Sequence, residues 1–203
     1  MSTLYEISGR TAQKQRTRQA LLTAARELLA RGTTPTVEQA AAEAAVSRTT
    51  AYRYFPSQRD LLVAAHPEIA TSSLLPADPP EDAGERLAAV IEEFTRLVVE
   101  TEAQQRSMLR LSLDAEDQGP DALPLRQGRA IGWIGEALTP LQGTLSDRQL
   151  HRLVLAIRSS VGIEALTWLT DVAGLTREEA TRLMRWSAQA LLHASLTSEA
   201  PPP

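Results

Sequence analysis

The chain has 203 residues, of which 43% are hydrophobic and 23% are charged. This composition is typical of a soluble globular protein with one large or two small domains, and it excludes disorder along the whole length. The chain has no cysteine, which excludes a disulfide framework, a zinc–thiolate site, an iron–sulfur cluster and a cysteine nucleophile.

Targeting and membrane segments are also not expected. The first 20 residues are polar and lack the apolar core of a signal peptide. The most apolar stretch, residues 153–173, carries Arg158, Glu164 and Asp171, which argue against a membrane span. We therefore expect a cytoplasmic protein.

The formal net charge of −4 is divided unevenly along the chain. Residues 1–60 hold nine basic and five acidic groups, whereas the remainder holds 12 basic and 20 acidic groups. A basic front on an acidic body favours an N-terminal site for a polyanion. The excess is modest, so a chance distribution is the alternative.

The N-terminal part predicts a series of helices. Apolar residues recur at helical spacing between about residues 12 and 30, and Gly32 is placed to end that helix. Thr36 and Gln39 form a capping box, which predicts the start of a second helix.

Two short helices are expected next. Ser47 is suited to cap a third helix that runs to Phe55, and Ser57 with Asp60 resembles the cap of a fourth. Residues 36–55 thus comprise a helix, a turn and a second short helix, which is the length of a helix-turn-helix unit.

The remainder of the chain also predicts helices. Four prolines between residues 67 and 80 indicate a linker, and apolar residues then recur at helical spacing. Two long helices are expected at the end, one from Ser146 to a stop at Gly174 and one from Thr176 to about Leu196. We expect no strand.

The predicted third helix has the composition of a DNA-reading helix. In a helix-turn-helix the second helix lies in the major groove, where hydroxyls contact phosphates or bases and arginine reads guanine. A polar helical hairpin on a protein surface is the alternative. The residues crowded there are Ser47, Arg48, Thr49, Thr50, Tyr52, Arg53 and Tyr54.

The segment from Thr36 to Leu62, TVEQAAAEAAVSRTTAYRYFPSQRDLL, closely resembles the DNA-binding signature of the TetR family of bacterial transcriptional regulators. Its most specific parts are Val46-Ser47, the YRYFP string at residues 52–56, and Leu61-Leu62. The strong match covers about residues 12–65. The C-terminal two thirds are similar to the family only in helix count and length.

Two positions depart from the family pattern. Ala45 stands in the turn where the family usually has glycine, and alanine tolerates a left-handed backbone less well. Thr49 stands where many members have glycine, so it adds a side chain on the side that faces the groove.

The resemblance implies an all-α fold in two parts. Residues 1–65 are expected to form a three-helix DNA-binding head with a helix-turn-helix, and residues 66–199 a helical body for dimerisation and ligand binding. Residues 200–203 are expected to be a disordered tail. The implied function is that of a homodimeric repressor, which binds a near-palindromic operator in double-stranded DNA and is released by a small hydrophobic effector.

The resemblance also assigns DNA contacts by position. Arg48, Thr49 and Arg53 become candidates for base contacts, while Thr50, Tyr52 and Tyr54 mainly hold phosphates. Thr36 would offer a hydroxyl and a helix N-terminus to phosphate. The full set is Thr36, Ser47, Arg48, Thr49, Thr50, Tyr52, Arg53, Tyr54, Ser57 and Gln58.

The two last predicted helices are apolar on two sides, so each is expected to be buried on two sides. One side would face a symmetry mate in a four-helix arrangement, the alternative being a buried helix within a monomer. The candidate interface residues are Val161, Ala165, Trp168, Trp186, Ala190 and His193. The candidate effector pocket comprises Phe94, Met108, Trp133, Trp168 and Met184, although residues of these types are more often core or surface than a pocket wall.

Catalysis has little support in this sequence. The three histidines, His66, His151 and His193, are far apart and show no metal-binding spacing, and no nucleophile elbow, phosphate loop or dinucleotide fingerprint is present. We expect no enzyme, cofactor or metal site. The open alternatives are a DNA-binding regulator without a small-molecule ligand, an activator, and a helical enzyme or scaffold.

Overall fold

The computed structural model describes residues 4–65, 71–113 and 128–197. Regular structure in these ranges is helical, which confirms the predicted all-α class. Within them, β-type pairing is confined to one isolated bridge between Gln142 and Leu145. The predicted tail at residues 200–203 lies outside the described residues.

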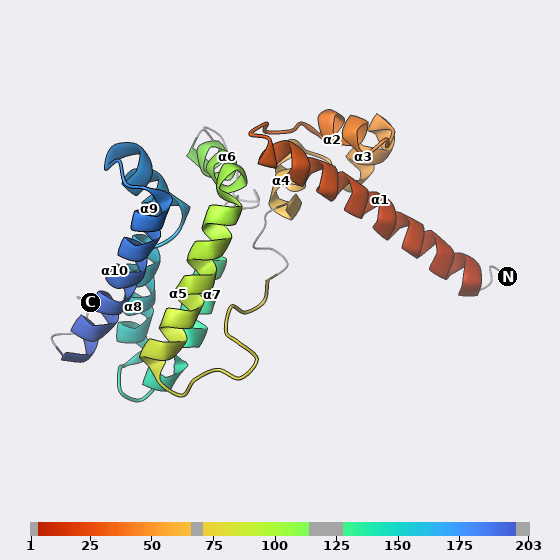
Figure 1. Ribbon diagram of the computed structural model, residues 1–203. Helices are drawn as coiled ribbons and strands as arrows, with labels where there is room; N and C mark the ends of the chain where they lie inside the picture. Colours follow the sequence, from red (N-terminus) through yellow and green to blue (C-terminus); the bar gives the residue numbers. More distant parts are fainter. Residues whose placement is uncertain (1–3, 66–70, 114–127, 198–203) are drawn as a thin grey trace. The chain divides into compact units, whose positions relative to one another are not determined.

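The described residues form two compact units (Figure 1). We call residues 4–65 with 103–113 the head, and residues 71–102 with 128–197 the body. The prediction placed every residue after 65 in the body. Helix α6 (Glu102–Leu113) instead supplies Met108 to the buried core of the head, so this unit is assembled from two separate stretches of the chain.

The head begins with a long helix. This helix, α1, runs from Leu4 to Ala30 and so starts well before the predicted beginning near residue 12. Gly32 ends α1 in the left-handed region at φ 78°, as the sequence predicts. The other head helices before α6 are α2 (Val37–Glu43), α3 (Arg48–Tyr54) and α4 (Gln58–Ala65).

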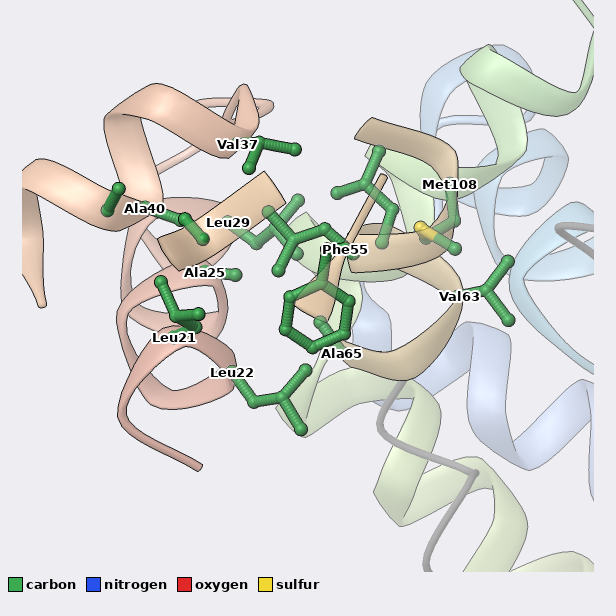
Figure 2. Packing of buried hydrophobic residues seen from close by; sticks show 14 residues of the cluster. Leu21, Leu22, Ala25, Leu29, Val37, Ala40, Phe55, Val63, Ala65 and Met108 are labelled. Carbon is green, nitrogen blue, oxygen red and sulfur yellow. The ribbon is translucent and has the colours of Figure 1, made fainter. Parts of the chain in front are cut away.

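The core of the head combines small and large apolar residues (Figure 2). The small side chains of Ala40, Ala41 and Ala51 allow α2 to lie close to α1 and α3. Phe55, at the end of α3, is 2% exposed and anchors that helix in the core. Full burial of such a side chain is worth about 1.5–3 kcal/mol, so Phe55 largely fixes how α3 sits on the head.

The end of α4 is tied to two other helices of the head. The carbonyl oxygen of Ala65 accepts a hydrogen bond from Arg26 Nε at 3.2 Å and another from Gln104 Nε2 at 2.7 Å. A helix leaves its last carbonyls without intrahelical partners. These two donors, from α1 and α6, satisfy one of them.

The body is a helical bundle. Helix α10 packs against α5 and α8, and α7 packs against the same two helices. Capping boxes at Ser146 and Thr176 start α8 and α10, as predicted. The elements are α5 (Ala83–Glu100), α7 (Arg129–Ala137), η2 (Thr139–Leu141), α8 (Asp147–Ser160), α9 (Ile163–Thr167), η3 (Trp168–Val172) and α10 (Arg177–Thr197).

The prediction of one continuous helix from Ser146 to Gly174 is wrong, because the helix is interrupted between α8 and α9. Gly162 has φ 114°, and an added Cβ there would lie 2.8 Å from Arg158 Nη1. Arg158 holds the break: Nη1 donates to the carbonyl of Val161 at 2.8 Å and Nη2 pairs with Glu164 at 3.2 Å.

One segment of the body, Asp147–Val172, is long and apolar enough by composition to cross a membrane. Its most apolar window is 44% buried within the body, and the break at Gly162 interrupts its helical hydrogen bonds. A membrane span needs its backbone groups paired internally. Length and composition alone are therefore weak evidence for a membrane span here.

Candidate nucleic-acid interface

The start of α2 has the predicted capping box. Thr36 Oγ1 accepts from the backbone N–H of Gln39 at 3.2 Å, and Gln39 Oε1 accepts from the backbone N–H of Thr36 at 2.8 Å. Thr36 is exposed at this N-terminus. It therefore presents its hydroxyl beside the positive end of the helix, where anions bind favourably.

The turn between α2 and α3 contains the departure noted in the sequence. Ala45 has φ 53°, a left-handed conformation that costs a residue with a Cβ about 1–2 kcal/mol. The turn is a Schellman motif, in which Val46 N–H donates to Ala41 O at 2.9 Å and Ala45 N–H donates to Ala42 O at 3.2 Å. Val46 packs against the head core, which offsets part of that cost.

Helix α3 presents a polar face to solvent. Ser47 caps it, with Oγ accepting from the backbone N–H of Thr50 at 3.2 Å. Ala51, and Phe55 just after the helix, are buried in the core, and the other residues of α3 are exposed or half-buried. The exposed members of the predicted contact set here are Ser47, Arg48, Thr49 and Arg53, and the half-buried ones are Thr50, Tyr52 and Tyr54.

Sequence reasoning missed Glu38. Its Oε1 accepts a hydrogen bond from Tyr52 Oη at 2.6 Å and pairs with Arg48 Nη2 at 2.9 Å. We call Glu38, Arg48 and Tyr52 the Glu38 cluster. The hydrogen bond from Tyr52 lowers the pKa of Glu38, and the same bond raises the pKa of Tyr52. The missed signal was an acidic residue inside a basic, hydroxyl-rich motif.

Other basic side chains lie against aromatic rings of the head. Arg53 lies over the ring of Tyr54 at 5.7 Å, and Arg18 of α1 lies over the ring of Phe55 at 5.4 Å. Such stacking restrains the guanidinium while leaving its N–H groups available.

The two predicted contacts at the start of α4 are engaged inside the head. Ser57 Oγ donates to Asp60 Oδ2 at 2.7 Å, within the predicted cap. The Gln58 amide donates to the carbonyl of Pro35 at 2.9 Å and so braces the segment before α2. Arg110 of α6 donates to Thr34 Oγ1 at 2.8 Å in the same segment.

The five residues predicted to line an effector pocket do not all belong to one buried group. Phe94 and Trp133 are buried in the body and pack edge to face with ring centres 5.8 Å apart, and Met184 is also buried there. Met108 is instead in the head core, because α6 packs with the head. Trp168 is 59% exposed on η3 and does not join the buried group.

The predicted interface residues also divide. Trp168, Trp186 and His193 are exposed, and Ala165 and Ala190 are half-buried. Val161 is fully buried in the body, because the break at Gly162 turns it inward. Four further exposed apolar residues of α8, η3 and α10 stand outside the predicted interface set: Leu155, Val172, Leu183 and Leu196.

Comparison with known families identifies the head. Residues 21–65 match the family of bacterial regulatory proteins described as the tetR family. The matched range covers the buried part of α1 and all of α2, α3 and α4. The chain matches no curated protein.

Proposed function

Because the chain is a TetR family regulator, with the DNA-binding region of that family at residues 21–65, we propose that it is a homodimeric repressor of transcription. DNA binding and regulation of transcription follow from the family, whose members are generally not enzymes. The proposal adds that it binds a near-palindromic operator, acts in the cytoplasm, and is released by a small hydrophobic effector.

The observation that carries the proposal is the uncovered polar face of α3. In the major groove this face would place Arg48, Thr49 and Arg53 at base edges. Thr50, Tyr52 and Tyr54 would lie toward phosphates, and Thr36 would add the N-terminus of α2. Two heads in a dimer would reach half-sites about 34–36 Å apart.

Exposed apolar residues support the dimer. Trp186 of α10 is 67% exposed and Val172 of η3 is 71% exposed, and Leu155, Trp168 and Leu183 are also uncovered. Large apolar side chains gathered on neighbouring elements mark an interaction surface. A second copy of the body, with its own α8 and α10, would cover them in a four-helix arrangement.

The effector remains part of the proposal, and a regulator without a small-molecule ligand is the second candidate. The packing of Phe94 against Trp133 favours that candidate, because these residues and Met184 are occupied as core. A screen of small apolar compounds against the operator complex separates the two. Release by a compound that also raises the unfolding temperature supports the effector, and a screen without release supports the second candidate.

The first experiment is selection from a pool of random duplexes, followed by sequencing. An enriched inverted repeat supports dimeric recognition and supplies the operator. Arg48→Ala and Tyr52→Ala dimers are expected to stay folded and to lose operator binding. The assignment of α3 to DNA recognition is contradicted if the wild type enriches no sequence, or if both variants keep the wild-type affinity.

The sign of regulation needs a separate measurement. A reporter gene with the selected operator overlapping its promoter is expected to fall in expression when the chain is produced. A rise in expression would make the protein an activator.

A further inference from the structure

The Glu38 cluster lies where the head meets DNA in the proposed complex. Glu38 belongs to α2, whereas Arg48 and Tyr52 lie one helical turn apart on α3 and share a face. The Arg48 guanidinium also lies 5.7 Å from the centre of the Tyr52 ring. Carboxylate, guanidinium and phenol therefore form a closed triangle that joins the two helices of the motif.

This arrangement restricts two side chains with predicted DNA contacts. Arg48 is 73% exposed, so without a partner its long side chain would sample many rotamers. The bond to Glu38 uses one of its five N–H donors and leaves others for a base edge. The bond to Tyr52 likewise fixes the direction of the phenol hydroxyl.

The negative charge of Glu38 opposes DNA binding, whereas the positive charge of the surrounding arginines favours it. Arginine gains affinity for any DNA by neutralising phosphates and releasing counterions, independently of sequence. A carboxylate paired with Arg48 cancels part of that gain and is itself repelled by phosphate. The cost is offset only where Arg48 also finds hydrogen-bond acceptors on a base.

We propose that Glu38 is a specificity-determining positioning residue: by holding Arg48 and Tyr52 it weakens binding to arbitrary DNA and sharpens selection of the operator. The inference rests on the proposed operator binding. It assigns a role to a residue that touches DNA only through its neighbours.

Glu38→Gln in the full-length chain tests the proposal, with Glu43→Gln as the matched control. Glu43 lies on the same helix, its side chain is 39% exposed against 37% for Glu38, and it pairs with Arg31 of α1 rather than with α3. Both variants remove one surface carboxylate. Only the first removes the charge that faces Arg48.

Affinity is measured by fluorescence anisotropy on a 30-base-pair duplex of arbitrary sequence over a range of salt concentrations. We expect Glu38→Gln to bind this duplex about tenfold more tightly than the wild type. The slope of log affinity against log salt concentration should be steeper by roughly 0.9, because one more phosphate is neutralised. Arg48→Gln should then cost more affinity in the Glu38→Gln chain than in the wild type. A purely structural brace would change neither the slope nor this coupling.

The selection from random duplexes supplies the second readout. Glu38→Gln is expected to enrich the operator less strongly than the wild type, by about tenfold, whereas Glu43→Gln enriches it as the wild type does. Equal enrichment by the wild type and Glu38→Gln overturns the inference and leaves the proposed function intact. If the wild type enriches no sequence, operator binding itself is overturned, and the inference with it.

A measurement without DNA tests the cluster in solution. Ionisation of the tyrosines, followed by ultraviolet absorbance, should show a late-titrating group in the wild type that is absent from Tyr52→Phe. The same group should titrate earlier in Glu38→Gln, because the hydrogen bond from Tyr52 to the carboxylate raises the pKa of Tyr52. Identical titration of the wild type and Glu38→Gln would overturn the inference regardless of DNA binding.

Discussion

The head and the body leave different kinds of side chain uncovered. On the head, α3 exposes hydroxyls and arginines that are held by local polar contacts, as in the Glu38 cluster. On the body, α10 and η3 expose Trp186 and Trp168. Polar side chains that hydrogen-bond to one another are stable in contact with water. Large exposed apolar side chains are instead stabilised when a partner surface covers them. The head is thus suited to a charged partner, and the body to an apolar one.

The largest expected effect comes from the core under α3. Phe55→Ala should destabilise the head by about 3–5 kcal/mol, because it leaves a cavity where Phe55 is buried. DNA binding should be lost while the body still dimerises, as measured by anisotropy and light scattering. Phe94→Ala is the matched change in the body. Loss of dimerisation in Phe55→Ala would show that the two units do not behave separately.

Breaking the apolar surface of the body should have the next largest effect. Trp186→Arg places a charge in the proposed interface and should raise the dimer dissociation constant by at least about a hundredfold, in line with interface hot spots. Light scattering against concentration measures this. Ala88→Arg, an exposed change on α5, serves as the control. An unchanged dimer in Trp186→Arg would assign the apolar surface to another partner.

The polar surface of the head is tested by Arg53→Ala. Removal of an exposed guanidinium that reads a base should lower operator affinity by about 1–3 kcal/mol and relax selection at one position of the site. Arg31→Ala removes another exposed charge, one that pairs with Glu43, and it should leave selection unchanged. Equal effects of the two changes would show that Arg53 contributes only its positive charge and does not read a base.

The smallest effect is expected in the turn. Ala45→Gly should stabilise the head by about 1 kcal/mol, because glycine adopts the left-handed region without the Cβ penalty. Ala42→Gly, on exposed α2 nearby, should destabilise it by about 0.5–1 kcal/mol. Thermal unfolding monitored by circular dichroism distinguishes the two signs. A destabilised Ala45→Gly would show that the alanine methyl packs favourably.

The head was largely predictable because its signals are local. Each predicted cap of α2, α3 and α4 lies within four residues of the groups it bonds, at Thr36, Ser47 and Ser57. Periodicity and one family motif then place the exposed face of α3. The Glu38 cluster was not predictable, because the contact of Glu38 with Tyr52 depends on how α2 crosses α3.

The body was less predictable because its breaks depend on contacts made after folding. The sequence around Gly162 continues the helical pattern on both sides, and the break is held by Arg158 bonding to Val161 and Glu164. The position of α6 also depends on contacts made after folding. Met108 is apolar at a helical position, and its periodicity is equally compatible with either core.

The carbonyl of Ala65 has a consequence for protein engineering. A transplant of residues 4–65 onto a foreign scaffold would leave behind Gln104 and Met108, so one bond to this carbonyl and part of the core cover would be lost. A modular sensor built from this protein should therefore carry residues 103–113 with the graft, as a separate helix reconnected by a designed loop.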